Sequence, residues 1–110
     1  AGVVLMSAGV LSRVETSVSE GNRELGILVA QQTSAELVGN EVLGNLLGGI
    51  VVKDAKTRVE IANNTVTRNK KAGIMVDRNA TMIRFENNRV SGNDGVQEDL
   101  KAELGESKER

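Results

Sequence analysis

The sequence predicts an all-β protein in which parallel strands stack into a solenoid of about four coils, each 22–24 residues long. The first reason is self-similarity, since the runs GIVVKDAKTRVEIANNTVTRNKKA and GIMVDRNATMIRFENNRVSGND match position by position. The second is their strand character. Each run opens with glycine and three apolar residues, continues with alternating polar and apolar residues, and turns at Asn-Asn. A length of 110 residues leaves room for one domain.

The repeat extends backwards from these two runs towards the start of the chain. The first coil is the least regular, because Val14 and Val18 are four residues apart where Ile61 and Val66 are five apart. Terminal repeats of solenoids are often atypical in this way. The predicted coils are residues 2–25, 26–48, 49–72 and 73–94, within a repeat domain of residues 1–95. Their opening glycines are Gly2, Gly26, Gly49 and Gly73, and Gly95 continues the series.

Apolar residues at equivalent positions of successive coils predict the core. Stacked coils place such residues in columns with the spacing of neighbouring strands, about 4.8 Å. Four columns are expected: Ile27, Ile50 and Ile74; Val29, Val52 and Val76; Leu37, Ile61 and Phe85; Val42, Val66 and Val90.

The pattern changes in residues 96–110. Val96, Leu100 and Leu104 recur every four residues among polar ones, and Asp94 and Gln97 are spaced like the capping pair at a helix N-terminus. We therefore expect a short amphipathic helix that covers the open strand edges of the last coil and ends at Gly105. Residues 106–110 are expected to form a frayed, charged tail.

Each repeat has the motif Gly-Ile-x-Val, then an alternating strand, then Asn-Asn-x-Val with a further Asn. This motif resembles the right-handed parallel β-helix repeat. It is similar to coils of the pectate-lyase-like superfamily, and to the modules of NosD-like periplasmic proteins, F-box β-helix proteins and Shc-binding spindle proteins. The resemblance implies a right-handed β-helix from about Gly2 to Gly95. It implies no single function, because that superfamily includes lyases, hydrolases, epimerases, phage spikes and binding scaffolds.

Asparagine forms two further columns at the corners between strands. Stacked side-chain amides at a corner can bond to each other and to the turn backbone, which holds the register of the coils. A sugar-binding or ion-binding role is the alternative. The two expected ladders are Asn40, Asn64 and Asn88, and Asn45, Asn69 and Asn93.

A charged corner follows the opening strand in two coils. If the coils stack as aligned, Lys53 lies against Asp77 and Asp54 against Arg78, which predicts two ion pairs. The resemblance implies that a catalytic site would use such a combination of acids and bases. Solvated surface pairs are the alternative. No acidic cluster accumulates to hold a metal ion, and we expect no cofactor.

The opening strands carry three consecutive apolar residues, although alternate residues of a strand point to opposite faces. One apolar residue of each strand must therefore face outward. This stripe is covered by a protein partner or a second copy, or else by the C-terminal helix or further chain of the same molecule. Its members are Val4, Leu28, Val51 and Met75.

Composition excludes several function classes. The net charge of −1 gives no reason to expect nucleic-acid binding, and no segment is long and apolar enough for a membrane span. Carbohydrate binding is disfavoured, because the single aromatic residue, Phe85, falls in a core column. The absence of cysteine and of a signal-type segment favours a cytoplasmic location.

Three functions remain open. The first is a non-catalytic scaffold that binds protein partners or itself through the apolar sheet face, with its open N-terminal end as a further surface. The second is a carbohydrate-active enzyme, or a remnant of one, that uses the charged corner. The third is a structural role within a larger β-helix.

Overall fold

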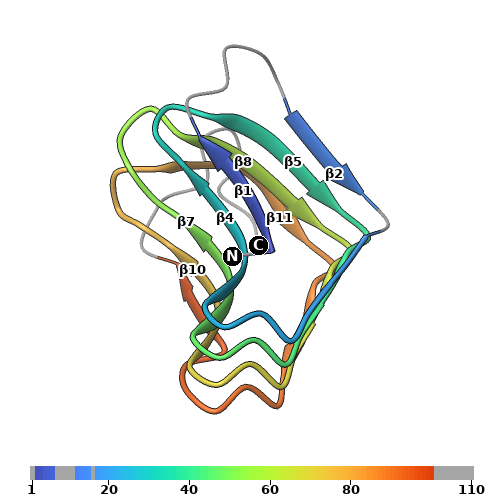
Figure 1. The fold of residues 1–110 in the computed structure, drawn as a ribbon. Helices are drawn as coiled ribbons and strands as arrows, with labels where there is room; N and C mark the ends of the chain where they lie inside the picture. Colours follow the sequence, from blue (N-terminus) through green and yellow to red (C-terminus); the bar gives the residue numbers. More distant parts are fainter. Residues whose placement is uncertain (1, 7–11, 16, 101–110) are drawn as a thin grey trace.

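The computed structural model describes residues 2–6, 12–15 and 17–100, and this part of the chain consists of strands joined by short corners (Figure 1). The first sheet contains β1 (Val3–Met6), β4 (Leu25–Ala30), β7 (Gly48–Val52), β10 (Ala72–Val76) and β13 (Glu98–Leu100). The second contains β2 (Ser12–Glu15), β5 (Ser34–Val38), β8 (Arg58–Ala62) and β11 (Thr81–Glu86). The third contains β3 (Val18–Glu20), β6 (Glu41–Leu43), β9 (Thr65–Thr67) and β12 (Arg89–Ser91).

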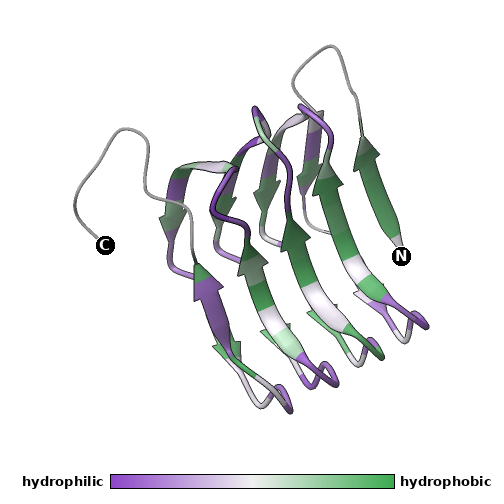
Figure 2. Ribbon diagram, turned by 90° about the vertical axis from the view of Figure 1, so that its left-hand side faces the viewer, coloured by the Kyte–Doolittle hydropathy of each residue, from purple (hydrophilic) through white to green (hydrophobic). Residues whose placement is uncertain are grey.

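Every strand pairs in parallel with the strand three places along the chain, which is the topology of a solenoid. Leu28 lies opposite Val51, and Val51 lies opposite Met75, as the sequence alignment predicts. The all-β solenoid of about four coils is therefore confirmed. The first sheet forms one side of the molecule, and Figure 2 shows it face on.

The core lies between the three sheets and includes the predicted aliphatic columns, together with a further column of Ala35, Val59 and Met82 that the sequence analysis did not name. Ile27, Leu37 and Val42 are buried, as are their counterparts in the next coil. Burial of each such side chain contributes about 1.5–3 kcal/mol to folding. Phe85 and Val90 are only partly buried, because β11 and β12 are the last strands of their sheets. Met82 is buried in the last coil, in register with the buried Val59 and next to a register shift in β11.

A left-handed backbone recurs at two of the corners in successive coils. At the corner after the second sheet, φ is 69° at Gly39, 59° at Asn63 and 56° at Asn87. Glycine and asparagine tolerate this region best, which explains the first asparagine of each Asn-Asn pair. The corner after the third sheet has φ of 68° at Gly44 and 57° at Arg68. Arg68 thus occupies a position where glycine stands in the coils before and after it.

We expect the change Arg68→Gly to raise the free energy of unfolding by about 0.5–1 kcal/mol, because glycine has no Cβ to strain this left-handed backbone. Chemical denaturation of the purified protein measures the change. Arg23→Gly is the matched control: Arg23 is exposed and has no positive φ, so the same substitution there should destabilise the protein. Equal losses at both sites would contradict the strain argument.

The prediction of a C-terminal helix is wrong for the residues that the structure describes, up to Leu100. Glu98–Leu100 forms β13, which pairs with β10 and places Leu100 beside Val76. The four-residue spacing of Val96 and Leu100 suits a helix, but the unpaired edge of β10 offers hydrogen bonds that a strand can take up. The register also places Gln97, rather than Gly95, in the column of the opening glycines. The rest of the predicted helix, with Leu104 and Gly105, and the charged tail lie outside the described residues.

Candidate functional site

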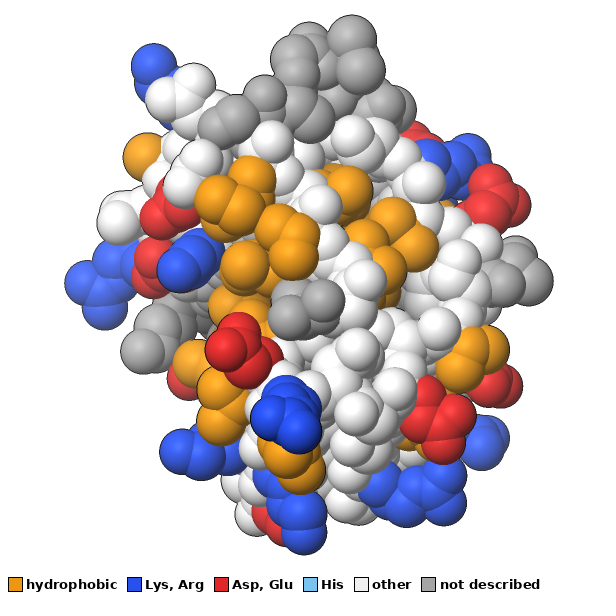
Figure 3. Space-filling view, viewed as in Figure 1, with side chains coloured by type: hydrophobic (Ala, Val, Ile, Leu, Met, Phe, Trp, Pro, Cys, Tyr) orange, Lys and Arg blue, Asp and Glu red, His pale blue; other side chains and the backbone are white. Residues whose placement is uncertain are grey.

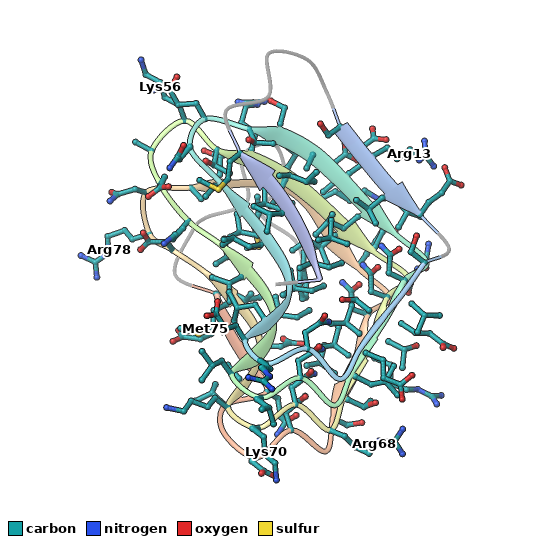
Figure 4. All side chains as sticks on the ribbon, in the orientation of Figure 1. Arg13, Lys56, Arg68, Lys70, Met75 and Arg78 are labelled. Atoms are coloured by element: carbon teal, nitrogen blue, oxygen red, sulfur yellow. The ribbon has the colours of Figure 1, made fainter. Side chains whose placement is uncertain are left out.

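The outer face of the first sheet carries the predicted apolar stripe. Val4 is 47% exposed and Met75 is 38% exposed, while Leu28 and Val51 between them are half-buried. The four residues lie in register across adjacent strands. In Figure 4 the Met75 side chain points away from the interior of the solenoid. The outward stripe is therefore a continuous feature of this face.

Further apolar residues near the stripe were missed in the sequence. Met6 lies two residues after Val4 in the same strand, so it shares the outer face, and it is 43% exposed. Leu46 and Leu47 are exposed in the corner that leads into β7. The sequence could have indicated that these positions are exposed, because the next coil has two lysines there.

The stripe ends at a shallow depression of about 220 Å³, lined in part by Val51 and Met75. Asp99 lines the same depression and takes the next position of the stripe, opposite Met75. Lys53 and Asp77 border it. The apolar surface therefore ends in charged groups at the C-terminal side of the sheet.

The predicted ion pairs at the charged corner are wrong. Among the described residues, neither Lys53 with Asp77 nor Asp54 with Arg78 forms an ion pair, although Lys53 and Asp77 follow paired strands. Asp54 has a left-handed φ of 82°, and its carboxylate accepts a hydrogen bond from the Gln31 backbone N–H at 3.0 Å.

Asp77 likewise accepts a hydrogen bond from the backbone N–H of Arg78 at 2.7 Å. The Arg78 side chain extends into solvent in Figure 4. The two carboxylates thus stabilise turns, and the four residues do not converge. A catalytic role for them stays a prediction.

The asparagine ladders are confirmed. The Oδ1 atom of Asn64 accepts hydrogen bonds from the backbone N–H of Asn40 at 2.9 Å and from its Nδ2 at 3.0 Å. Asn64 donates in turn to Asn88 at 3.0 Å. Asn45, Asn69 and Asn93 repeat this pattern. Because these amides are bonded within the protein, they are not available to a sugar or an ion.

The second ladder is longer than predicted. Asn22 donates to Asn45 Oδ1 at 2.7 Å, and Gln97 Oε1 accepts from Asn93 Nδ2 at 2.8 Å. Asn22 could have been assigned to the ladder from the sequence, because it stands one repeat length, 23 residues, before Asn45. Gln97 is the residue that the helix prediction used as a cap. No buried side-chain nitrogen or oxygen lacks a partner in the described part of the chain.

The outer face of the second sheet is charged instead of apolar. Arg13 forms ion pairs with Glu15 at 2.8 Å and Glu36 at 3.2 Å. Arg84 pairs with Glu86 at 2.6 Å and Glu60 at 4.0 Å. The hydrogen bond from Arg84, followed by its charge, lowers the pKa of the Glu86 carboxyl. All of these groups lie at the surface, where such pairs contribute little to stability.

We expect Arg84→Gln to raise the pKa of Glu86 back towards its ordinary value, because the substitution removes the bonding cation. Carbon NMR of the Glu86 carboxyl during a pH titration measures this shift. The lowered pKa favours folding above the ordinary carboxyl pKa, and that contribution is lost as pH falls through the folded-state pKa. The control Arg58→Gln should leave the Glu86 pKa unchanged; an equal shift there would assign the effect to general charge.

Other kinds of site receive no support from the described residues. They contain no group of three or more His, Cys, Asp or Glu side chains that could hold a metal ion. They also contain no helix that could span a membrane.

Three parallel sheets around an aliphatic core, with buried asparagine ladders at the corners, define a β-helical repeat protein. A family model described as the right handed beta helix region matches residues 2–100. The chain therefore belongs to the right-handed β-helix family. Comparisons with curated proteins and with solved structures gave no match. Membership of one of the named branches of the superfamily stays a prediction.

Proposed function

We propose that this β-helix is a non-catalytic scaffold that binds a protein through the outer face of its first sheet. The observation that carries the proposal is the apolar stripe of Val4, Leu28, Val51 and Met75. The equivalent outward positions of the second sheet carry ion-paired charges such as Arg13 and Arg84. One molecule thus presents one apolar and one charged sheet face, and exposed apolar patches mark interaction sites.

The stripe runs across the strands, which suits a partner that presents an apolar sheet face or an extended segment. Its charged border, formed by Lys53, Asp77 and Asp99, limits how a partner can be oriented. A second copy of the chain meets this description as well as a foreign protein does. Solution mass distinguishes the two.

The test is Val51→Glu, which places a charge at the centre of the stripe. If the stripe joins copies of the chain, light scattering should show an oligomer of the wild type. In the Val51→Glu variant the Kd of this oligomer should rise by at least about 100-fold, because an unpaired carboxylate is costly to bury. The control Thr65→Glu adds the same charge to the outer face of the third sheet and should leave the oligomer intact.

If the wild type is monomeric at all concentrations, self-association is excluded and a foreign protein remains as the proposed partner. In that case the wild type and the Thr65→Glu variant should retain a binding protein that the Val51→Glu variant loses. A partner or oligomer that tolerates Val51→Glu, in a variant with an unchanged circular dichroism spectrum, would contradict the proposal.

A further inference from the structure

The charged corner beside the stripe provides two groups of opposite sign that do not pair within the described structure. Lys53 and Asp77 directly follow the paired strands β7 and β10, so they lie at the same end of the first sheet. Both side chains are exposed, and neither forms an ion pair with a described residue. Figure 3 shows acidic and basic side chains next to apolar ones along the left-hand side of the molecule, where β7 and β10 lie.

Each of these charges stands two residues after a member of the stripe. Lys53 follows Val51 in one coil, and Asp77 follows Met75 in the next. Alternate residues of a strand share a face, and all four of these residues line the same depression. The two rows of this four-residue block thus have a similar apolar part and opposite charges. Such a block is complementary to a copy of itself in which the order of the rows is reversed.

A two-fold axis that runs along the strands, midway between β7 and β10, reverses the rows in this way. Val51 of one copy then packs against Met75 of the other. Likewise, Lys53 of one copy faces Asp77 of the other. The interface is isologous, so each contact occurs twice. The axis also keeps the strands of the two sheets within about 30° of one another, which is the usual geometry of stacked sheets.

Other placements of the axis are less complementary. An axis through Val51 would place Lys53 opposite Lys53 of the second copy, and an axis through Met75 would bring the two Asp77 side chains together. An axis between β4 and β7 would leave both charges opposite uncharged residues. An axis parallel to the stripe would set the half-buried Asp99 of each copy against the other. Because like charges that face each other oppose association, the axis between β7 and β10 is favoured.

The shape of the surface agrees with this axis. The depression of about 220 Å³ lies on it, because all four residues of the block line the depression. Met75 is 38% exposed, and its thioether side chain is long and flexible enough to fill the depression of the second copy. Asp99 lies on the far side of Met75 from the axis, at the margin of the contact, where polar residues are usual.

We propose that the occupant of the stripe is a second copy of the chain, docked about a two-fold axis between β7 and β10. Two ion pairs, each between Lys53 of one copy and Asp77 of the other, hold the register. This inference rests on the proposed function, of which it specifies the partner and the orientation. The apolar residues supply most of the attraction, because charge pairs at an exposed border give orientation more than affinity.

The test uses two charge reversals, Lys53→Glu and Asp77→Lys, studied alone and as an equimolar mixture. In either variant alone, both ion pairs become like-charged, so the dimer Kd measured by light scattering should rise at least about 10-fold. In the mixture, both pairs join opposite charges again, and a heterodimer should form with a Kd near the wild-type value. Labelling one variant with ¹⁵N allows native mass spectrometry to distinguish the heterodimer. A variant that merely misfolds cannot regain association on mixing.

The matched control is Arg58→Glu, which makes the same change of charge at an exposed position of the second sheet and should change Kd by less than about 2-fold. A monomeric wild type at all concentrations would overturn this inference and leave the proposed function to a foreign protein. A dimer that Val51→Glu dissociates but the charge reversals do not would support the stripe and overturn the register. A mixture that forms no heterodimer would overturn the register as well.

Discussion

Replacing Asn69 by alanine should lower the free energy of unfolding by about 3–5 kcal/mol. Asn69 lies in the middle of the longer ladder and is fully buried. Its Oδ1 accepts from the backbone N–H and Nδ2 of Asn45, and its Nδ2 donates to Asn93 Oδ1 at 2.8 Å and Val42 O at 3.2 Å. Alanine leaves these donors and acceptors buried without a partner, and each such loss costs about 1–3 kcal/mol.

Urea denaturation followed by circular dichroism measures this loss. The matched control is Asn79→Ala, since Asn79 is exposed in a turn and makes no side-chain hydrogen bond within the described structure. The control should change stability by less than about 0.5 kcal/mol. A similar small loss at both positions would show that the ladder is not the source of stability that its geometry indicates.

Replacing Gly49 by alanine should cost about 2–3 kcal/mol, because the new methyl group has no room. A Cβ built at Gly49 lies 2.5 Å from both Gly73 O and Val66 Cγ1, and 3.0 Å from Asn69 Nδ2. The backbone of this coil must therefore approach the core column and the ladder closely. This contact, and not a turn, explains why each of the four coils opens with glycine.

The neighbouring glycine provides an internal control for this second prediction. A Cβ at Gly48 meets Ala72 O at 3.3 Å and Leu25 Cδ2 at 3.4 Å, and side chains already stand at this position as Leu25 and Ala72 in adjacent coils. Gly48→Ala should therefore be neutral or slightly stabilising. The two variants differ by one position, so thermal unfolding of both separates crowding from any general effect of removing glycine. Equal Tm values would refute the crowding argument.

The fold was predictable because its determinants repeat. A residue that stands at one position in several coils, such as Ile27 with Ile50 and Ile74, reports a column directly. The ladders were predictable for the same reason, but their ends were not. Asn22 and Gln97 belong to irregular coils, where the repeat pattern is weakest.

The misses have physical causes that a linear pattern does not contain. The spacing of Val96 and Leu100 fits a helix turn and a strand that reaches back to the core equally well, and the free edge of β10 decides between them. At the charged corner, register alone suggested ion pairs. The left-handed backbone of Asp54 instead directs its carboxylate to a turn N–H. The apolar stripe was predictable as a surface, because its residues stand at one position of successive coils.

The uniform parallel register also determines how the chain can fold. Every paired residue has its partner 23 or 24 positions away, whether at the start, as for Val3 with Ile27, or at the end, as for Ile74 with Glu98. Each new coil therefore closes a loop of the same modest length, so the entropic cost per coil is constant. Once one pair of coils has nucleated, the rest can add one at a time in either direction. A nascent chain can thus acquire native structure before its synthesis is complete.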